Sequence, residues 1–395
     1  MNPLRVPVQF HLMAKPSGSR CNLACSYCFY LSKDDLYPGS SFRMPDKVLE
    51  EYIKQTIAAH NVTEVTFAWQ GGEPTILGLD FFKKALALQK KYQKPGMIVG
   101  NTIQTNGTLL DDRWCEFLTQ NHFLVGISID GPQRFHDSNR KDISGTGTFD
   151  RAIQGLSLLK KHGVEFNILC AVNQVNGNHP LEVYRFFRDE IGARFIQFIP
   201  VVECDPVSGK ATPESVRSDQ FGNFLIAVFD EWVRRDVAKV YVQHFDTSLA
   251  NWYGEQHGIC VFSSTCGQAM VIEHNGDIYS CDHFVDRDHM IGNIMNKTLK
   301  EIIASPTQLQ FGLNKRDTLP GFCQKCQFLF ACYGECPKNR FNVSPDGEMG
   351  LNYLCDGYWR FFAHIDEPMK FMVQELHAGR APANVMSFMR RKPPI

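Results

Sequence analysis

The stretch SRCNLACSYCFYL, residues 19–31, places three cysteines within eight residues in a C-x3-C-x2-C pattern, as Cys21, Cys25 and Cys28. Thiolates are the usual ligands of iron–sulfur clusters, and a cubane 4Fe–4S cluster usually takes four of them. Three thiolates would therefore leave one iron open to bind another molecule. A zinc site that lacks its fourth ligand, or a chance group of cysteines, is the alternative explanation of the same spacing.

The composition limits the class of protein around this motif. The chain has 395 residues, of which 44% are apolar, and its formal net charge is −1. This balance gives no sign of a nucleic-acid or anionic-membrane partner. No run of 18 apolar residues and no signal-peptide core occur, so we expect a cytoplasmic protein. In a reducing compartment, 14 cysteines favour metal ligation over disulfides.

The first part of the chain alternates apolar runs with amphipathic segments, which predicts strands that alternate with helices. Six such steps imply an α/β fold with a parallel sheet, a partial (β/α)6 barrel. We expect strands at 8–14, 64–69, 97–105, 123–130, 165–172 and 195–201, and helices at 45–60, 79–93, 111–120, 148–162, 181–191 and 218–236.

The character of the sequence changes near residue 240. Residues 250–360 are loop-rich and contain eight cysteines. We therefore predict a barrel domain over 1–240 and a cysteine-rich domain over 241–395, ending in a C-terminal helix or tail. The basic, proline-containing segment 379–395 is expected to be a loose end.

Functional loops in such folds follow the carboxyl ends of the strands. The cysteine loop follows the first predicted strand, and QGGEP, residues 70–74, follows the second. Gly71 and Gly72 would let the backbone approach a ligand closely. Glu73 offers a carboxylate to an ammonium group, although a Gly-Gly turn with a solvated Glu is also common.

The cysteine motif, with an aromatic residue, Tyr27, before its last cysteine, resembles the signature of the radical S-adenosylmethionine (SAM) enzymes. That resemblance implies that the open iron chelates SAM, whose reductive cleavage gives a 5′-deoxyadenosyl radical that abstracts hydrogen. It also implies a set of SAM contacts. These are the Gly-Gly-Glu loop at the amino group, Ser128 at the ribose, Arg140 at the carboxylate and Val202 against the adenine. A strand-end serine, a surface arginine and a core valine are the simpler readings of the last three.

The second half of the chain carries eight more cysteines, enough for two fully ligated cubanes. Zinc sites are the main alternative, because C-x2-C is equally a zinc signature. The pattern resembles the SPASM extension of radical-SAM enzymes that modify peptides. By that resemblance one auxiliary cluster is held by Cys260, Cys266, Cys281 and Cys336, and the other by Cys323, Cys326, Cys332 and Cys355. We expect Cys115, Cys170 and Cys204 not to bind metal.

Five segments, CNLACSYCFYL, AWQGGEP, TNGT, SIDGP and IYSCDHFV, together resemble the anaerobic sulfatase-maturating enzymes over about residues 10–365. The resemblance implies oxidation of a Cys or Ser side chain in a sulfatase to Cα-formylglycine. Asp282, directly after Cys281, would be the base that takes the side-chain proton. His283 is the weaker alternative, and turn capping is the simpler reading of Asp282. Tyr30 and Gln70 are candidate substrate contacts, with loop packing and strand capping as their simpler readings.

The partners expected from this resemblance are a sulfatase segment with the motif C/S-x-A/P-x-R and an electron donor such as flavodoxin or ferredoxin. The cofactors would be SAM and three 4Fe–4S clusters. A SPASM enzyme that forms thioether or carbon–carbon cross-links in a ribosomal peptide is the competing function. A zinc-stabilised binding module is another. The sequence leaves open whether the target is Ser or Cys, which sulfatase it belongs to, the reductant and the oligomeric state.

Overall fold

The computed structural model describes residues 10–255 and 259–391, which form two compact units. Each unit combines segments that are distant in the sequence. Of the described residues, unit 1 contains 10–128, 140–166 and 266–314, and unit 2 contains 129–139, 167–255, 259–265 and 315–391. Both units thus draw on both sides of residue 240, and the sequence division at that residue stays a prediction.

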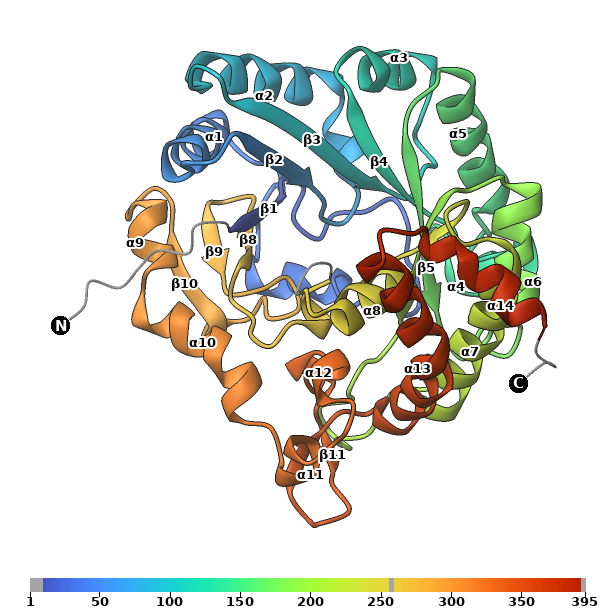
Figure 1. Cartoon of the computed structure of the whole chain (residues 1–395). Coiled ribbons are helices and arrows are strands. Elements are labelled where there is room, and N and C mark those ends of the chain that lie inside the picture. Colours follow the sequence, from blue (N-terminus) through green and yellow to red (C-terminus); the bar gives the residue numbers. More distant parts are fainter. Residues whose placement is uncertain (1–9, 256–258, 392–395) are drawn as a thin grey trace. The chain divides into compact units, whose positions relative to one another are not determined.

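Unit 1 is built on a mainly parallel sheet with helices on its outer side (Figure 1). Its strands are β1 His11–Lys15, β2 Glu64–Trp69, β3 Ile98–Thr105, β4 Phe123–Ser128, β8 Ala269–Glu273, β9 Asp277–Tyr279 and β10 Met290–Asn293. They follow the order β10-β9-β8-β1-β2-β3-β4. Neighbours from β8 to β4 pair in parallel, whereas β9 pairs antiparallel with both β8 and β10. Its longer helices are α1 Asp46–Ala59, α2 Leu79–Tyr92, α3 Asp112–Gln120 and α5 Phe149–Lys161, followed by α9 Leu299–Ile303 and most of α10 Pro306–Asp317. Short 3-10 helices lie at Leu31–Leu36, Pro74–Leu77 and Arg287–His289.

Aromatic packing holds the helices of unit 1 on its sheet. Trp69, the last residue of β2, is fully buried. Its ring meets those of Phe81 and Phe82 on α2 edge-on, at centroid distances of 6.0 and 5.8 Å. Its indole N–H donates to Oδ1 of Asn101 on β3 at 2.8 Å, so the polar end of the ring is also satisfied. The end of β2, from which the Gly-Gly-Glu loop leaves, is therefore rigid.

Unit 2 contains the remaining parallel strands and most of the C-terminal helices. The strands β5 Phe166–Val172, β6 Phe195–Pro200 and β7 Tyr241–Val242 pair in parallel, and β11 Asn342–Val343 pairs antiparallel with β12 Met349–Leu351. The helices are α4 Gln133–Asn139, α6 Pro180–Arg185, α7 Ser218–Arg235, α8 Gln243–Tyr253, α11 Gly321–Gln324, α12 Leu329–Cys332, α13 Cys355–His377 and α14 Val385–Arg390. A π-helix spans Phe186–Glu190, and 3-10 helices span Cys260–Phe262, Pro337–Asn339 and Pro382–Asn384.

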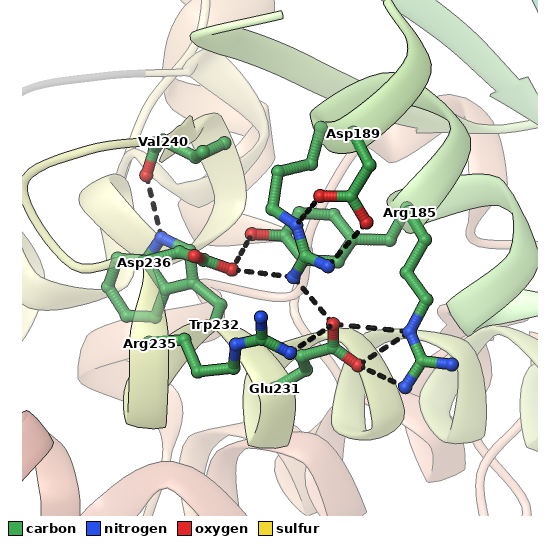
Figure 2. Close-up of polar contacts among 9 residues, drawn as sticks. Arg185, Asp189, Glu231, Trp232, Arg235, Asp236 and Val240 are labelled. Carbon is green, nitrogen blue, oxygen red and sulfur yellow. Dashed lines mark hydrogen bonds and ion pairs between the residues drawn. The ribbon is translucent and has the colours of Figure 1, made fainter. Parts of the chain in front are cut away.

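An ion-pair network fastens α6 and the π-helix to α7 (Figure 2). Glu231 on α7 lies 2.6 Å from the guanidinium of Arg185 and 2.5 Å from that of Arg188. Arg188 also contacts Asp236 at 2.9 Å, and its side chain is only 10% exposed. Because these charges are partly buried and shared among several partners, they fix the register of the two segments better than an exposed pair would.

The predicted α/β class with parallel strands is confirmed, and each predicted helix and strand is found within a few residues of its expected bounds. Residues 8 and 9 of the first predicted strand lie outside the described residues. The expectation that residues 379–395 are a loose end was wrong for the described part of that segment, and residues 392–395 lie outside the described residues. Val385 and Met389 of α14 are fully buried, and α14 packs on α7, because these two apolar side chains share one helical face. Within the described part of the chain, no helix combines the length and apolarity that crossing a membrane requires.

Candidate functional site

The cysteine loop leaves the end of β1 and is anchored by backbone contacts within unit 1. The amide of Ala24 donates to the carbonyl of Lys141 at 2.8 Å. The sulfur of Cys21 accepts from the amide of Leu23 at 3.3 Å and from Nδ2 of Asn106 at 3.8 Å. Burial raises the pKa of the Cys21 thiol to about 12, and the neighbouring thiols of Cys25 and Cys28 add to this effect. The three sulfurs are thus close enough to influence one another, and a metal would have to displace their protons.

The Gly-Gly-Glu loop lies directly against the cysteine loop. The amide of Gly72 donates to the carbonyl of Gly18 at 2.8 Å, and the amide of Glu73 donates to the carbonyl of Arg20 at 2.9 Å. A Cβ on Gly72 would lie 2.1 Å from the Arg20 oxygen, which is not sterically allowed. Gly71 has φ +134°, a region that favours glycine. The close approach that the glycines permit is therefore to the cysteine loop itself, whereas the sequence suggested an approach to a ligand.

Glu73 is 1% exposed, and its carboxylate is surrounded by donors from the protein. Oε1 accepts from the amide and hydroxyl of Thr75 at 3.0 and 2.6 Å and from the Thr105 hydroxyl at 2.8 Å. Oε2 accepts from the amide of Asn106 at 2.7 Å. Burial raises the pKa of Glu73, while these hydrogen bonds oppose the shift. The side chain thus joins the end of β2 to the end of β3, and its predicted contact with a ligand ammonium stays a prediction.

The other predicted SAM contacts lie in both units. In unit 1, Ser128 ends β4 and is buried, and the Arg140 guanidinium lies over the Tyr27 ring, 5.6 Å from its centroid. In unit 2, Val202 is 3% exposed, and its carbonyl accepts from Nζ of Lys338 at 3.0 Å. The roles of these four residues stay predictions.

Three candidate residues from three different loops meet at the buried ammonium of Lys15, the last residue of β1. Lys15 is 3% exposed, and its Nζ lies 3.7 Å from Oδ2 of Asp282 and 3.4 Å from Oε1 of Gln70. The same ammonium lies over the ring of Tyr30, 4.4 Å from its centroid. The predicted base and both predicted substrate contacts therefore surround one positive charge.

A chain of buried polar groups continues from this cluster. The Tyr30 hydroxyl donates to Oε1 of Glu273, whose Oε2 lies 2.8 Å from Nδ1 of His274. Burial, and after it the charge of Glu273, raises the pKa of Tyr30 well above its usual value. Because its proton is already donated, the Tyr30 hydroxyl can contact a substrate only as an acceptor. His283, the alternative base, packs its ring against that of Phe29 at 5.1 Å.

Asp282 itself keeps one side toward solvent. Its side chain is 24% exposed, and Oδ1 accepts from the thiol of Cys281 at 3.7 Å. A carboxylate held between a buried cation and a predicted cluster ligand, yet reachable from outside, has the surroundings that a general base needs. Its predicted catalytic role is consistent with this position and remains untested.

Unit 2 groups four of the predicted auxiliary ligands. Burial raises the pKa of Cys355 to about 12, and the charges of Cys323 and Cys326 raise it further. Burial, and after it the charge of Cys355, also raises the pKa of Cys332. This grouping is consistent with the predicted second auxiliary set, whose role as cluster ligands stays a prediction. The other set has Cys266 and Cys281 in unit 1 and Cys260 and Cys336 in unit 2, so it stays a prediction.

The remaining cysteines are Cys115 and Cys170, both fully buried, and the partly exposed Cys204. Within residues 10–255 and 259–391, no three His, Cys, Asp or Glu side chains converge as the ligands of a single metal ion do. A four-iron cubane spaces its thiolates farther apart than a single ion, so the cysteine groups described above remain compatible with clusters.

Known proteins that resemble this chain identify its family. Residues 16–187 match the Radical SAM superfamily, and residues 260–327 match an iron–sulfur cluster-binding domain. The chain is 48% identical to the serine-type anaerobic sulfatase-maturating enzyme of Bacteroides thetaiotaomicron, over 96% of this chain and 95% of that protein. The chain belongs to the anaerobic sulfatase-maturating enzymes.

Two further comparisons support this assignment. The cysteine-type anaerobic sulfatase-maturating enzyme of Clostridium perfringens is 36% identical over 89% of this chain and 95% of that protein. A solved structure of anSMEcpe with bound AdoMet and Cp18Cys peptide matches with a TM-score of 0.84 and 34% identity, over 93% of this chain and 99% of that one. The predicted radical-SAM barrel, followed by a cysteine-rich iron–sulfur domain, is thereby confirmed.

Lys15 and Glu273 were missed by the sequence analysis. Lys15 stands at the end of an apolar strand, directly before the cysteine loop, and a lysine there usually reaches solvent. Glu273 ends β8, which pairs with β1 in parallel so that Glu273 lies opposite Lys15. A charged residue at the end of an apolar strand run was the available signal at both positions.

Proposed function

We propose that this enzyme oxidises a Cys or Ser side chain of a sulfatase polypeptide to Cα-formylglycine. The observation that carries the proposal is the convergence of Asp282, Gln70 and Tyr30 on the ammonium of Lys15. It supports a reaction in which one side chain of a substrate is held and loses a proton. The relatives that align over nearly the whole chain are sulfatase-maturating enzymes, which favours this function over peptide cross-linking.

The residues of unit 1 suit the cofactors of the family. Cys21, Cys25 and Cys28 supply three thiols, and two N–H donors already face the Cys21 sulfur. The Ser17 hydroxyl beside Gly71 is fully buried and has no hydrogen-bond partner among the described residues, which suits a polar ligand at this loop. We propose that these cysteines hold a 4Fe–4S cluster and that the Gly-Gly-Glu loop, Ser128, Arg140, Tyr27 and Val202 bind SAM. When bound, SAM and the clusters supply the acceptors of a hydrogen atom and of an electron.

The eight cysteines after residue 259 would hold two further 4Fe–4S clusters. The electrostatic coupling among Cys323, Cys332 and Cys355 supports one of these sets. If both sets and the N-terminal cysteines are occupied, anaerobic reconstitution should give about twelve irons per chain. Replacing the three N-terminal cysteines together by Ala should leave about eight. Saturation of the wild type near four irons, or binding of zinc, would contradict the assignment.

The role that we assign to Asp282 is to accept the proton of the substrate hydroxyl or thiol at one of its carboxylate oxygens. Converting a CH2–OH group to an aldehyde removes two hydrogens, and the base takes the one on oxygen as a proton. From a CH2–SH group the same loss gives a thioaldehyde, which water converts to the aldehyde while the sulfur leaves as hydrogen sulfide. Gln70 and Tyr30 would orient the side chain beside this base. The substrate we propose is an extended sulfatase segment with C/S-x-A/P-x-R, and the reductant a flavodoxin or ferredoxin, with no membrane or nucleic-acid partner.

The test uses anaerobically reconstituted enzyme, SAM, a reductant and matched peptides with Ser or Cys in that motif. Formation of the peptide aldehyde, detected by mass, together with 5′-deoxyadenosine, detected by chromatography, is the expected result. If 5′-deoxyadenosine forms while both peptides keep their mass, the proposed reaction is wrong for these substrates.

The Asp282→Asn variant tests the base. Asparagine keeps the shape and much of the hydrogen bonding but cannot take up the proton, and general bases contribute about 10²–10⁴-fold. Aldehyde formation should fall by that order, while iron content is retained and 5′-deoxyadenosine is still produced. Aldehyde formation near the wild-type rate would remove Asp282 from this role. Loss of iron together with activity would show that the residue caps its turn.

A further inference from the structure

Lys15 is a buried cation that has no partner at ordinary hydrogen-bond distance among the described residues. Typical N–H···O hydrogen bonds are 2.7–3.2 Å long. Among the described residues, the shortest polar contact of the Lys15 ammonium is the 3.4 Å contact to Gln70. Its ion pair with Asp282 is longer, at 3.7 Å. A lysine with 3% exposure loses most of its hydration, so its charge must be compensated by the groups around it.

Those groups face Lys15 from three directions. The Asp282 carboxylate, which follows β9, provides the opposite charge. The ring face of Tyr30 provides a cation–π contact, and its hydroxyl leads on to the Glu273 carboxylate. The backbone of the Gln70 loop is also fixed, because the backbone N–H of Gln70 donates to the carbonyl of Ala14 at 2.9 Å. The ammonium therefore lies between a carboxylate, an aromatic ring and a loop whose backbone is held in place.

The charge also decides which end of the Gln70 amide faces it. An ammonium group has only donors, so it must face Oε1 rather than the NH2 group. Nε2 then lies on the other end of the amide, and no hydrogen bond to it is found among the described residues. Gln70 can therefore offer N–H donors to a bound molecule, while Asp282 can offer an acceptor. A substrate hydroxyl or thiol that gives its proton to Asp282 and accepts a hydrogen bond from Gln70 would match this pair.

We propose that Lys15 is a positioning residue of the oxidation, fixing the Gln70 amide and the Asp282 carboxylate in the orientations that the substrate side chain meets. This inference rests on the proposed function. The ammonium acts through Gln70 and Asp282 and takes no part in the making or breaking of covalent bonds. Loss of the ammonium should leave the cofactors bound but let both groups rotate away.

The main variant is Lys15→Met, which keeps the length of the stem and removes the charge. A misplacement of about 1 Å at a reacting group costs on the order of 10²-fold in rate. We therefore expect the turnover number for aldehyde to fall about 10- to 100-fold. The ratio of 5′-deoxyadenosine to aldehyde should rise about tenfold or more, with iron per chain unchanged. Lys15→Arg, which restores a cation, should recover part of the coupling.

The matched control is Lys84→Met. Lys84 also forms an ion pair, with Asp46 at 2.6 Å, but both side chains are exposed. This variant should behave as the wild type in rate, coupling and iron content. If Lys15→Met keeps full iron and couples cofactor cleavage to aldehyde as well as Lys84→Met does, the inference is overturned. If the wild type itself makes no aldehyde, the proposed function fails instead.

A second variant decides the matter if Lys15 substitutions lose iron or fail to fold. Gln70→Glu keeps an oxygen toward the ammonium but replaces the amide N–H donors with an acceptor. We expect the KM for the peptide to rise about tenfold or more while iron content stays at the wild-type level. An unchanged KM would show that the orientation of the Gln70 amide is irrelevant to substrate binding, and the inference would be abandoned.

Discussion

Replacing Glu73 with Gln tests whether its carboxylate binds a ligand or holds the loops together. In the best orientation, the Gln oxygen replaces Oε1 and keeps three donors. The NH2 group then meets the amide of Asn106, at a position where Oε2 accepts at 2.7 Å. Two donors face each other, and a buried N–H left without a partner costs about 1–3 kcal/mol.

The three remaining hydrogen bonds weaken because their acceptor loses its charge. Bonds to charged groups are worth about 1.5–3 kcal/mol each, against about 0.5–1.5 for neutral ones. Burial opposes the charged form of Glu73, so removing the charge recovers free energy that offsets this loss. The orphaned Asn106 amide therefore sets the net effect, a destabilisation of about 1–3 kcal/mol. Unfolding entropy is about 2.1 cal/mol/K per residue, which is about 0.8 kcal/mol/K for 395 residues, so Tm should fall by about 1–4 °C.

Thermal unfolding of the anaerobic, reconstituted enzyme, followed by circular dichroism, measures this change. Iron content should also fall, because Asn106 contacts the Cys21 sulfur at 3.8 Å. Glu64→Gln at the exposed start of β2 is the control and should leave Tm and iron unchanged. If Glu73→Gln keeps wild-type Tm and iron but binds SAM tenfold more weakly, the carboxylate acts on the ligand directly and the structural argument is refuted.

A close backbone approach and a buried histidine give two further predictions. Gly72→Ala places a Cβ 2.1 Å from the Arg20 oxygen, so the cysteine loop must move. We expect about eight irons per chain instead of about twelve. The control is Gly100→Ala, whose Cβ would lie 3.3 Å from a side-chain atom, and it should keep all the iron. Burial lowers the pKa of His244 to about 4, below its usual value of about 6.5, so the folded state binds fewer protons than the unfolded state between these values. The free energy of unfolding should therefore rise by about 3 kcal/mol as pH increases from about 4 to about 6.5. His244→Phe should remove this dependence in denaturant titrations at several pH values.

Local patterns were enough to predict the barrel elements. The run EVTFAW coincides with β2, because alternating and β-branched residues favour an extended strand that is buried on one side. The helix over residues 79–93 is found as Leu79–Tyr92, with its apolar face on the sheet. The loops after these strands carry the candidate site, as expected for parallel strands.

Long-range contacts could not be predicted in the same way. The segment of β8 is separated from β1 by about 250 residues, and no local pattern indicates that the two strands pair. The pattern identified Gly72 but could not show that its neighbour is the backbone of Arg20. Lys15 looks like any lysine at a strand end, and only the fold shows that Asp282 and Gln70 cover it.

The end of β1 links the predicted cofactor site to the predicted chemistry. Lys15 contacts the candidate base, and three residues later Gly18 accepts from the Gly72 amide of the Gly-Gly-Glu loop at 2.8 Å. The cysteine loop begins at the same turn, so its position, that of the Gly-Gly-Glu loop and that of Asp282 depend on one short segment. Substitutions around this segment should therefore differ in what they change. Gly72→Ala, in the loop that packs against it, should lower the iron content. Lys15→Met should raise the ratio of 5′-deoxyadenosine to aldehyde while iron is retained.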